Sequence, residues 1–409
     1  MIEVIGIAAA GWESLGPGER DDVLNADLLL GGRRHLDLVP NAPGQRRVPW
    51  PKDLKGALPA LLEGHESSSV VVLASGDPLV AGVAATIMEV VGAPAVRIRP
   101  AVSSVALARA RLGWPDETVE VIRLRGDDLD VVRRVLFPGH RLLILSRDAN
   151  SPGEIAQLLD DAGFGDSMLT VLGDLGTASE SSRVSRAADY AGGAPQLNIV
   201  GVECRTRSAG SWSLAPGLPD ALFDHDGQLT KRNLRASALA HLLPRPGEML
   251  WDVGAGAGSV AIEWLRCHPT CRAVAVERNQ DRVNRIQANA SRLGVPGLSV
   301  QHGSAPEALT GLPQPDAVFV GGGATSETVG RCWSALAPGG RLVVHAVTHE
   351  TEMVITDEWR RHGGELTRIS VESLEPIGSY HGWKPARAIV QWSVLKPMDP
   401  RGLTSMGRR

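Results

Sequence analysis

The sequence contains no apolar run long enough to cross a membrane. Its longest runs, such as Val70 to Ala74, have only the length of a strand, whereas a membrane helix needs about 20 apolar residues. The N-terminus begins with a strand-like stretch from Ile2 to Ile7 and lacks the basic region and apolar core of a secretory signal. We therefore expect a cytoplasmic protein without membrane segments.

A basic excess is also missing, and lysine is scarce. The formal net charge is −4 at pH 7, which argues against a nucleic-acid partner because nucleic-acid-binding proteins carry a clear basic surplus. Only five of the 42 basic residues are lysines. The arginine excess suits recognition of carboxylates, since the guanidinium fork binds them bidentately; a GC-rich genome would explain it equally.

Cysteine is rare as well. Of the four cysteines, Cys267 and Cys271 are spaced i, i+4, but no second pair and no histidine cluster accompanies them. Because a structural zinc site needs about four such ligands, we expect no metal and reduced thiols.

The 409 residues are otherwise typical of a soluble globular protein of two or three domains, with 43% hydrophobic and 22% charged residues. Short Val, Ile and Leu runs alternate with helical stretches in two segments, which predicts an α/β protein. In the second segment the alternation predicts a mostly parallel, doubly wound sheet. The predicted organisation is a first domain at 1–204, a linker at 205–216, a second domain at 217–395 and a flexible tail at 396–409.

The most informative stretch is in the second domain, where the strand Leu250 to Val253 leads into the glycine-rich turn Gly254 to Gly258 and then into a helix. Glycines let the backbone approach a ligand closely, and a helix N-terminus favours an anionic group. Glu277 ends the next strand, 19 residues after Gly258, and can accept hydrogen bonds from ribose hydroxyls. The glycines follow the spacing G-x-G-x-G, with Asp252 two residues before the first, whereas dinucleotide-binding loops have the fingerprint G-x-G-x-x-G. The observed spacing therefore favours S-adenosylmethionine over a dinucleotide as the ligand. A nicotinamide enzyme or a purely structural turn stays open at this point.

Three further motifs accompany this loop. Gly227 to Arg235 precedes it, and Gly303 to Leu309 and Pro315 to Gly322 follow it. Together the four motifs resemble the decarboxylating, carbon-15 methylating enzymes of precorrin-6B (precorrin-6Y) metabolism, from about Gly217 to Val394.

That resemblance implies a Rossmann-like methyltransferase domain that uses S-adenosylmethionine. Thr230 would also serve as an N-cap of its helix. The family usually has an acidic residue where Asn233 stands and often an Asp where Ser304 stands. The implied cofactor-binding residues are Thr230, Gly254, Ala255, Gly256, Ala257, Gly258, Glu277, Ser304 and Ala305.

The first domain carries a different set of motifs. A buried strand ends in the turn Ser75 to Leu79, Ala101 to Gly113 follows, Val4 to Ile7 opens the chain, and Gly31 to Arg33 lies between. This set resembles the tetrapyrrole methylase family, specifically its carbon-5 methylating member, over about Ile2 to Cys204. In that two-lobed fold S-adenosylmethionine binds in a cleft between α/β lobes. The cofactor contacts that the resemblance implies are Gly76, Asp77, Leu79, Ser103 and Ser104.

The first domain departs from its family at four positions. Ala8 replaces a glycine of the opening loop, and Ala10 replaces an acidic residue. Arg123 and Arg125 stand in a stretch where the family has Ser-Leu-His-Gly-Arg. A binding module that holds a tetrapyrrole without catalysis is therefore an alternative for this half.

Together the two resemblances match the fused methyltransferases of cobalamin synthesis. They imply methylation of precorrin-6B at ring carbons 5 and 15, with decarboxylation of the carbon-12 acetate. A homo-oligomer, a tetramer through the second domain, is also implied by resemblance. Candidate catalytic groups near the second loop are Lys231, Arg235, His345 and His381, and Arg232 joins Arg235 as a candidate for binding substrate carboxylates. The rival enzyme is a Rossmann methyltransferase for RNA, protein or another small metabolite, which leaves the first 200 or so residues unexplained.

Overall fold

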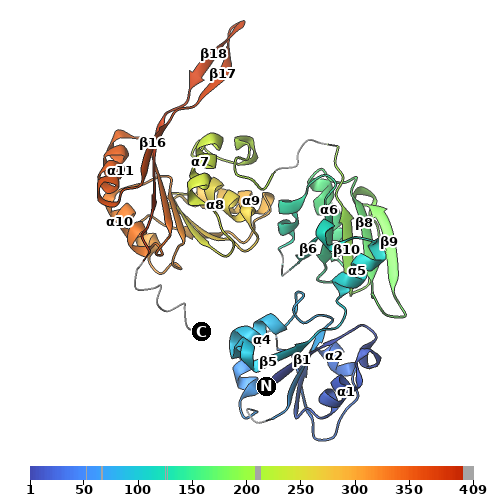
Figure 1. The fold of residues 1–409 in the computed structure, drawn as a ribbon. Coiled ribbons are helices and arrows are strands. Elements are labelled where there is room, and N and C mark those ends of the chain that lie inside the picture. Colours follow the sequence, from blue (N-terminus) through green and yellow to red (C-terminus); the bar gives the residue numbers. More distant parts are fainter. Residues whose placement is uncertain (52, 66–67, 125, 127, 208–212, 399–409) are drawn as a thin grey trace. The chain divides into compact units, whose positions relative to one another are not determined.

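The computed structural model describes residues 1–51, 53–65, 68–124, 126, 128–207 and 213–398. The chain divides into two compact units (Figure 1), one formed by Met1–Leu129 with Phe137–Gly210 and the other by Asp130–Leu136 with Ser211–Arg409. Parts of the predicted linker and tail lie outside the described residues, so their predicted boundaries stay predictions.

The first sheet of the N-terminal unit is entirely parallel, in the order β3-β2-β4-β1-β5. Its central strands β2, β4 and β1 are largely apolar on both faces, as parallel strands covered by helices must be. Val72 packs toward α3 and α4 on one face, and Leu73 packs toward α1 and α2 on the other. The elements are β1 (Ile2–Ile7), α1 (Pro17–Leu24), β2 (Leu28–Gly31), α2 (Arg33–Asp37), β3 (Arg46–Pro49), α3 (Leu54–Leu62), β4 (Val70–Ser75), α4 (Ala84–Val91) and β5 (Val96–Arg99).

The second sheet of this unit is mostly antiparallel, in the order β6-β7-β10-β8-β9, and only β6 and β7 run parallel. Leu143, Leu172 and Ile199 of this sheet pack with Trp114 and the helix α5. The elements are α5 (Ser104–Leu112), β6 (Glu120–Arg123), β7 (Arg141–Leu145), α6 (Ser151–Asp161), β8 (Met168–Gly173), β9 (Ser181–Arg186) and β10 (Asn198–Glu203).

The C-terminal unit has a seven-stranded sheet in the order β13-β12-β11-β14-β15-β19-β16. The first five strands are parallel, which confirms the predicted parallel-rich sheet, and β19 and β16 add an antiparallel edge. Trp264 of α8 is buried on one face among α7, α8 and α9, while Trp392 of β19 is buried on the other face, which α10 and α11 cover.

Local sequence signals fix where several of these helices begin. The side chains of Asn279, Thr325 and Thr348 accept hydrogen bonds from the first-turn N–H groups of α9, α10 and α11. The elements are α7 (Arg232–Leu242), β11 (Met249–Val253), α8 (Ser259–Cys267), β12 (Arg272–Glu277), α9 (Gln280–Arg292), β13 (Ser299–His302), β14 (Ala317–Val320), α10 (Ser326–Ala335), β15 (Arg341–Ala346), α11 (His349–His362), β16 (Glu365–Ile369) and β19 (Ile389–Leu395).

A two-stranded hairpin, β17 (Glu372–Ile377) and β18 (Tyr380–Pro385), extends from the edge of this sheet (Figure 1). It exposes four large apolar side chains, which form the cross-strand pairs Leu374–Trp383 and Ile377–Tyr380. An isolated hairpin is only marginally stable in water. Four exposed apolar side chains on one such element form a patch of the kind that marks an interaction surface.

Within the described residues, no helix combines the length and the apolar character needed to span a membrane. The same residues contain no group of three or more His, Cys, Asp or Glu side chains arranged to hold a metal ion. Cys267 and Cys271 are both free thiols.

Candidate functional site

A pocket of about 1050 Å³ opens at the carboxyl edge of the parallel strands in the C-terminal unit. Open α/β sheets bind ligands at this edge, outside the carboxyl ends of the strands. The ends of β11, β12, β14 and β15 form its floor, the segment Gly227–Leu234 forms one wall, and residues at the base of the hairpin, including Ser373 and Glu375, form another.

The glycine-rich turn is shaped by close backbone approaches. Gly254, Gly256 and Gly258 all have positive φ angles, of 70°, 59° and 75°. A Cβ on Gly254 would lie 2.6 Å from the carbonyl oxygen of Gly322, and one on Gly256 would lie 2.7 Å from that of Gln228. Both contacts are with backbone, so neither neighbour can easily give way, and the turn requires glycine at these two positions.

Seven of the nine residues expected at the C-terminal cofactor site line this one pocket. Ala257 and Gly258 do not: Ala257 is buried, and Gly258 faces Ile286 of α9 behind the turn. Thr230 lies at the pocket, but the N-cap position of α7 belongs to Lys231, so the alternative role of Thr230 as N-cap is wrong. The seven are Thr230, Gly254, Ala255, Gly256, Glu277, Ser304 and Ala305.

Two buried carboxyl groups stand beneath the turn. Glu277 accepts hydrogen bonds from the N–H groups of Gly256 (2.9 Å) and Asn279 (3.0 Å). Asp252 accepts one from Ala261 N–H (2.9 Å) through Oδ2, whereas its buried Oδ1 has no hydrogen-bond partner in the part of the chain that the structure describes. Burial raises the pKa of Asp252 to about 7, with the Ala261 N–H opposing this and the negative charge of Glu277 reinforcing it.

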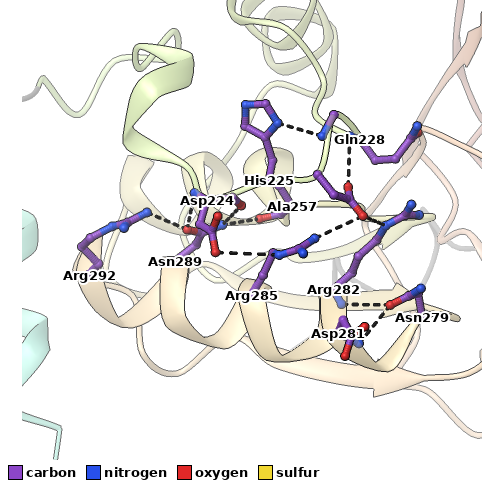
Figure 2. Close-up of polar contacts among 12 residues, drawn as sticks. Asp224, His225, Gln228, Ala257, Asn279, Asp281, Arg282, Arg285, Asn289 and Arg292 are labelled. Carbon is purple, nitrogen blue, oxygen red and sulfur yellow. Dashed lines mark hydrogen bonds and ion pairs between the residues drawn. The ribbon is translucent and has the colours of Figure 1, made fainter.

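The segment Asp224–Gln228, which continues into the pocket wall, is fastened to α9 by an ionic network (Figure 2). Asp226 pairs with Arg282 at 2.9 Å and with Arg285 at 3.1 Å. The hydrogen bond from Arg282 is the main reason that the pKa of Asp226 falls to about 2. Asn289 accepts the Asp224 N–H at 2.9 Å and donates to the carbonyl of Ala257 at 3.1 Å, which links the segment to the turn. Sequence reasoning missed this network, since its partners lie some 60 residues apart.

Two of the four catalytic candidates lie at the pocket. Lys231 lines it with a half-exposed side chain, 3.8 Å from the carboxylate of Asp220. His345 also lines it but is only 5% exposed, and its Nε2 lies 3.0 Å from Oε1 of Gln391. Burial lowers the pKa of His345 to about 4, against the raising effect of the Gln391 hydrogen bond, so its imidazole is neutral at pH 7.

Arg235 and His381 do not lie at the pocket. Arg235 is fully buried, and its guanidinium pairs with Glu263 and Asp220 and donates to the carbonyls of Leu218 and Thr230. It therefore holds the start of α7 in place, which corrects the expectation that it contacts substrate. His381 is exposed on β18 of the hairpin. Arg232, by contrast, does line the pocket.

In the N-terminal unit, three chain segments meet at the carboxyl edge of the first sheet. Gly76 N–H donates to the carbonyl of Ile7 at 2.9 Å, and the Gly76 carbonyl accepts from Ala101 N–H at 3.1 Å. A Cβ on Gly76 would lie 2.9 Å from Cα of Ser103, and one on Gly6 would lie 1.9 Å from the Gly76 oxygen. The strand ends of β1 and β4 and the start of α5 are thus in direct backbone contact.

The five residues expected at the N-terminal cofactor site come from this junction. Asp77 Oδ1 accepts the Leu79 N–H at 2.8 Å and so shapes its own turn, and Leu79 is exposed. Ser103 is the N-cap of α5, with Oγ 3.1 Å from the Ala106 nitrogen, and Ser104 begins that helix. Gly76 lies at the centre of the junction.

The four positions that depart from the family pattern lie in two regions of the N-terminal sequence. Ala8 and Ala10 lie where β1 leads into the turn at Gly11–Ser14, and Ala8 N–H donates to Ser14 Oγ at 3.2 Å. Arg123 is the last residue of β6, while Arg125 lies outside the described residues.

Two family matches cover most of the chain in sequence order. Residues 3–191 match the tetrapyrrole (corrin/porphyrin) methylases, and residues 221–396 match the precorrin methyltransferase domain. A tetrapyrrole methylase region followed by a precorrin methyltransferase region defines the class of the protein as a two-part methyltransferase.

Full-length relatives specify the class further. A precorrin-6Y C(5,15)-methyltransferase [decarboxylating] from Sinorhizobium sp. is 43% identical over 97% of this chain and 96% of its own length. The protein of that name from Mycobacterium tuberculosis (strain ATCC 25618 / H37Rv) is 38% identical over 97% of this chain and all of its own length. The chain belongs to the family of decarboxylating precorrin-6Y C(5,15)-methyltransferases. Among solved structures, the chain is similar to the crystal structure of the C-terminal domain of precorrin-6Y C5,15-methyltransferase from Rhodobacter capsulatus. The two sequences are 45% identical, the alignment covers 45% of this chain and all of that domain, and the TM-score is 0.44.

Proposed function

We propose that this protein methylates precorrin-6Y at ring carbons 5 and 15 and decarboxylates the carbon-12 acetate during cobalamin synthesis, with S-adenosylmethionine as methyl donor. The observation that carries the proposal is the match of both halves, in order and over nearly the whole chain, to relatives of that name. The pocket in the C-terminal unit and the backbone junction in the N-terminal unit supply one candidate site for each methylation.

The residues at the C-terminal pocket fit S-adenosylmethionine. Gly254 and Gly256 let the turn pack closely against the backbone of Gly322 and Gln228, and both glycines line the pocket in which the methionine part of the donor would lie. Glu277 is held by two N–H groups and keeps acceptor capacity for ribose hydroxyls. Ser304 and Ala305 lie at the pocket beyond β13, where they would contact the adenine.

The protein's main task in methyl transfer is orientation. When bound, the donor supplies an electrophilic sulfonium methyl group, and the ring carbon supplies the electron pair. Lys231, Arg232 and Arg387 line the same pocket and would hold carboxylates of the macrocycle while the ring carbon faces the methyl group.

Decarboxylation breaks the bond between the acetate carboxyl carbon and its methylene. The electron pair passes into the conjugated ring, carbon dioxide leaves, and a proton is later added at the methylene carbon. We propose that His345 does not deliver this proton as imidazolium, because its pKa of about 4 keeps it neutral at pH 7 and its single N–H, on Nε2, donates to Gln391 Oε1.

We place carbon-5 methylation in the N-terminal unit, at the Gly76–Ser103 junction. The alternative is that the N-terminal unit binds the tetrapyrrole without catalysis. Ala8, Ala10 and Arg123 support this alternative because they depart from the family pattern. We further propose that the protein is cytoplasmic and forms a homo-oligomer through the C-terminal unit, where the exposed apolar hairpin is the surface that supports self-association.

Mass spectrometry of precorrin-6Y incubated with the whole chain and methyl-labelled S-adenosylmethionine tests the function. We expect a gain of two labelled methyl groups and the loss of one carbon dioxide. One methyl with the same loss would leave the N-terminal unit as a binding module. No change, with donor binding demonstrated, would favour a methyltransferase for another metabolite.

A further inference from the structure

A compact polar cluster lies beside the N-terminal junction. The hydroxyl of Ser75, the last residue of β4, lies 2.7 Å from Nε2 of His35 and 3.2 Å from a guanidinium nitrogen of Arg34. Both partners belong to α2, which follows β2, the strand next to β4 in the sheet. Because Ser75 directly precedes Gly76, the cluster borders the proposed donor site.

The charge of Arg34 is not neutralised at short range. Among the residues that the structure describes, no carboxylate lies within 4.0 Å of its guanidinium; the guanidinium donates to Ser75 Oγ and contacts the neutral ring of His35. Asp174 acts on it only through longer-range attraction. Several other arginines of this unit are paired with carboxylates, as in Arg99–Asp22, Arg109–Asp116 and Arg111–Glu180.

Arg34 is nevertheless partly removed from water. It keeps solvent exposure overall, but burial around its guanidinium lowers the pKa of the group, and Asp174 only partly offsets this. A partly desolvated cation without a close counter-ion favours an anionic ligand, since that ligand restores the missing charge-assisted hydrogen bonds.

His35 supports this arrangement without adding charge. Burial, and then the charge of Arg34, lowers the pKa of His35 to about 4. The neutral ring therefore fixes the Ser75 hydroxyl through Nε2 and carries no charge that would repel Arg34, while its buried Nδ1 has no hydrogen-bond partner among the described residues.

Exposed apolar side chains follow the cluster along the chain and lie in the loop that contacts Gly76. Leu79 is 54% exposed and Val80 is 39% exposed in the turn after Ser75. Val102 is 58% exposed in the loop whose backbone contacts Gly76. Exposed apolar side chains near an arginine that has no close carboxylate among the described residues match a flat hydrophobic ring that carries carboxylates.

We propose that Arg34 and Ser75 form a carboxylate-binding subsite of the N-terminal unit, which receives a side-chain carboxylate of the macrocycle. This inference rests on the proposed carbon-5 methylation by that unit and assigns the residues that orient its substrate. Arg34 donates to the carboxylate. His35 is a positioning residue whose Nε2–H donates to Ser75 Oγ, which leaves the Ser75 O–H to donate to the carboxylate.

The test compares Arg34→Met with Arg33→Met in the full-length protein. Arg33 is the preceding arginine on the same helix, so the control matches the charge change and the location. We expect Arg34→Met to raise the KM for the macrocycle in carbon-5 methylation by roughly tenfold or more, and Arg34→Lys to recover part of the loss. Carbon-15 methylation, carbon dioxide release and the donor's Kd should stay at the Arg33→Met values. Equal KM values for the two Met variants would overturn the proposal.

A second readout separates ligand binding from the proposed function. A free-acid corrin and its carboxyl methyl ester are titrated into both variants without methyl donor, with tryptophan fluorescence as the signal. Discrimination is the ratio of the Kd of the ester to the Kd of the free acid. A smaller ratio in Arg34→Met than in Arg33→Met supports the subsite. This holds even if the wild-type chain adds no carbon-5 methyl group and that part of the proposed function fails. Identical discrimination in the two variants sinks the subsite, even if carbon-5 methylation is demonstrated.

Discussion

Glu277 and Gly256 are joined by a 2.9 Å hydrogen bond from the glycine N–H to the glutamate carboxylate, which ties the acid at the end of β12 to the turn after β11. The same carboxylate would bind the donor's ribose. We expect Glu277→Ala to weaken binding of S-adenosylmethionine at the C-terminal site by roughly tenfold to a hundredfold, because hydrogen bonds to a charged group are lost. Calorimetric titration measures this, and Glu277→Gln, which keeps an acceptor for Gly256, should lose less. An unchanged affinity in Glu277→Ala would remove Glu277 from the site.

The turn offers a matched pair of glycine substitutions. Gly254 and Gly323 both line the pocket with φ near 70°, but a Cβ on Gly254 would lie 2.6 Å from the Gly322 oxygen, and one on Gly323 would meet nothing within 4 Å. Gly323→Ala should cost only the left-handed backbone strain, about 1–2 kcal/mol of unfolding free energy. Gly254→Ala should cost clearly more and should abolish donor binding, as measured by urea unfolding and titration. Equal costs would mean that the close approach of the two loops does not matter.

Two buried groups of the C-terminal unit predict opposite pH dependences. The pKa of His345 is lowered from 6.5 to about 4, so the unfolded chain binds more protons in this window and stability is lost as pH falls through it. The pKa of Asp252 is raised from 3.8 to about 7, so the folded state binds more protons and stability is lost as pH rises through that window. Between pH 7.5 and 5 each effect amounts to about 2 kcal/mol, so the two nearly cancel in the wild type.

Single substitutions should separate these effects. Lowering the pH from 7.5 to 5 should stabilise His345→Asn relative to the wild type and destabilise Asp252→Asn relative to it. Urea unfolding at the two pH values, followed by tryptophan fluorescence, provides the measurement. If the unfolding free energies of all three proteins change equally between the two pH values, neither group has a shifted pKa.

The buried ion pair between Arg235 and Glu263 predicts a large stability effect without a direct effect on substrate. Arg235→Met leaves Glu263 buried without its partner, and we expect a loss of about 3–5 kcal/mol in unfolding free energy. The exposed pair Arg360–Asp357 is the control, and Arg360→Met should cost less than about 1 kcal/mol. If Arg235→Met folds with wild-type stability but raises the substrate KM, its assignment as a structural residue is wrong.

The hairpin provides a test of self-association. Replacing Trp383 and Ile377, one from each cross-strand pair, by Ser should lower the oligomeric state measured by light scattering during size-exclusion chromatography. The control replaces Lys384 and Glu375, which form an ion pair on the same hairpin, by Ser. This change should leave the measured mass of the oligomer at the wild-type value. A monomeric wild-type protein would contradict the proposed oligomer directly.

Much of the fold follows from local patterns. Runs such as Val70 to Ala74 and Ala317 to Val320 are strands because parallel strands covered on both faces must be continuously apolar. The glycine spacing also placed the turn correctly, since positive φ at Gly254 and Gly256 is a local property.

The hairpin and the role of Arg235 could not be read in the same way. Residues 372–385 mix exposed polar and apolar side chains, so no buried face marks them as strands. Arg235 resembles any basic residue early in a helix, and only the fold brings Glu263 of α8 against it. Likewise Arg34 and Ser75 meet because β2 and β4 are neighbours in the sheet, which no spacing in the sequence states.

The ionic network of Figure 2 makes the pocket wall sensitive to ionic strength. Asp226, Arg282 and Arg285 are each about a quarter to a third exposed, so their attraction is open to screening by dissolved salt. Salt would loosen the 224–228 segment without touching the backbone contacts that form the glycine turn. Association and release of the methyl donor and its demethylated product would then accelerate with added salt, so turnover limited by product release would increase before the fold itself is affected.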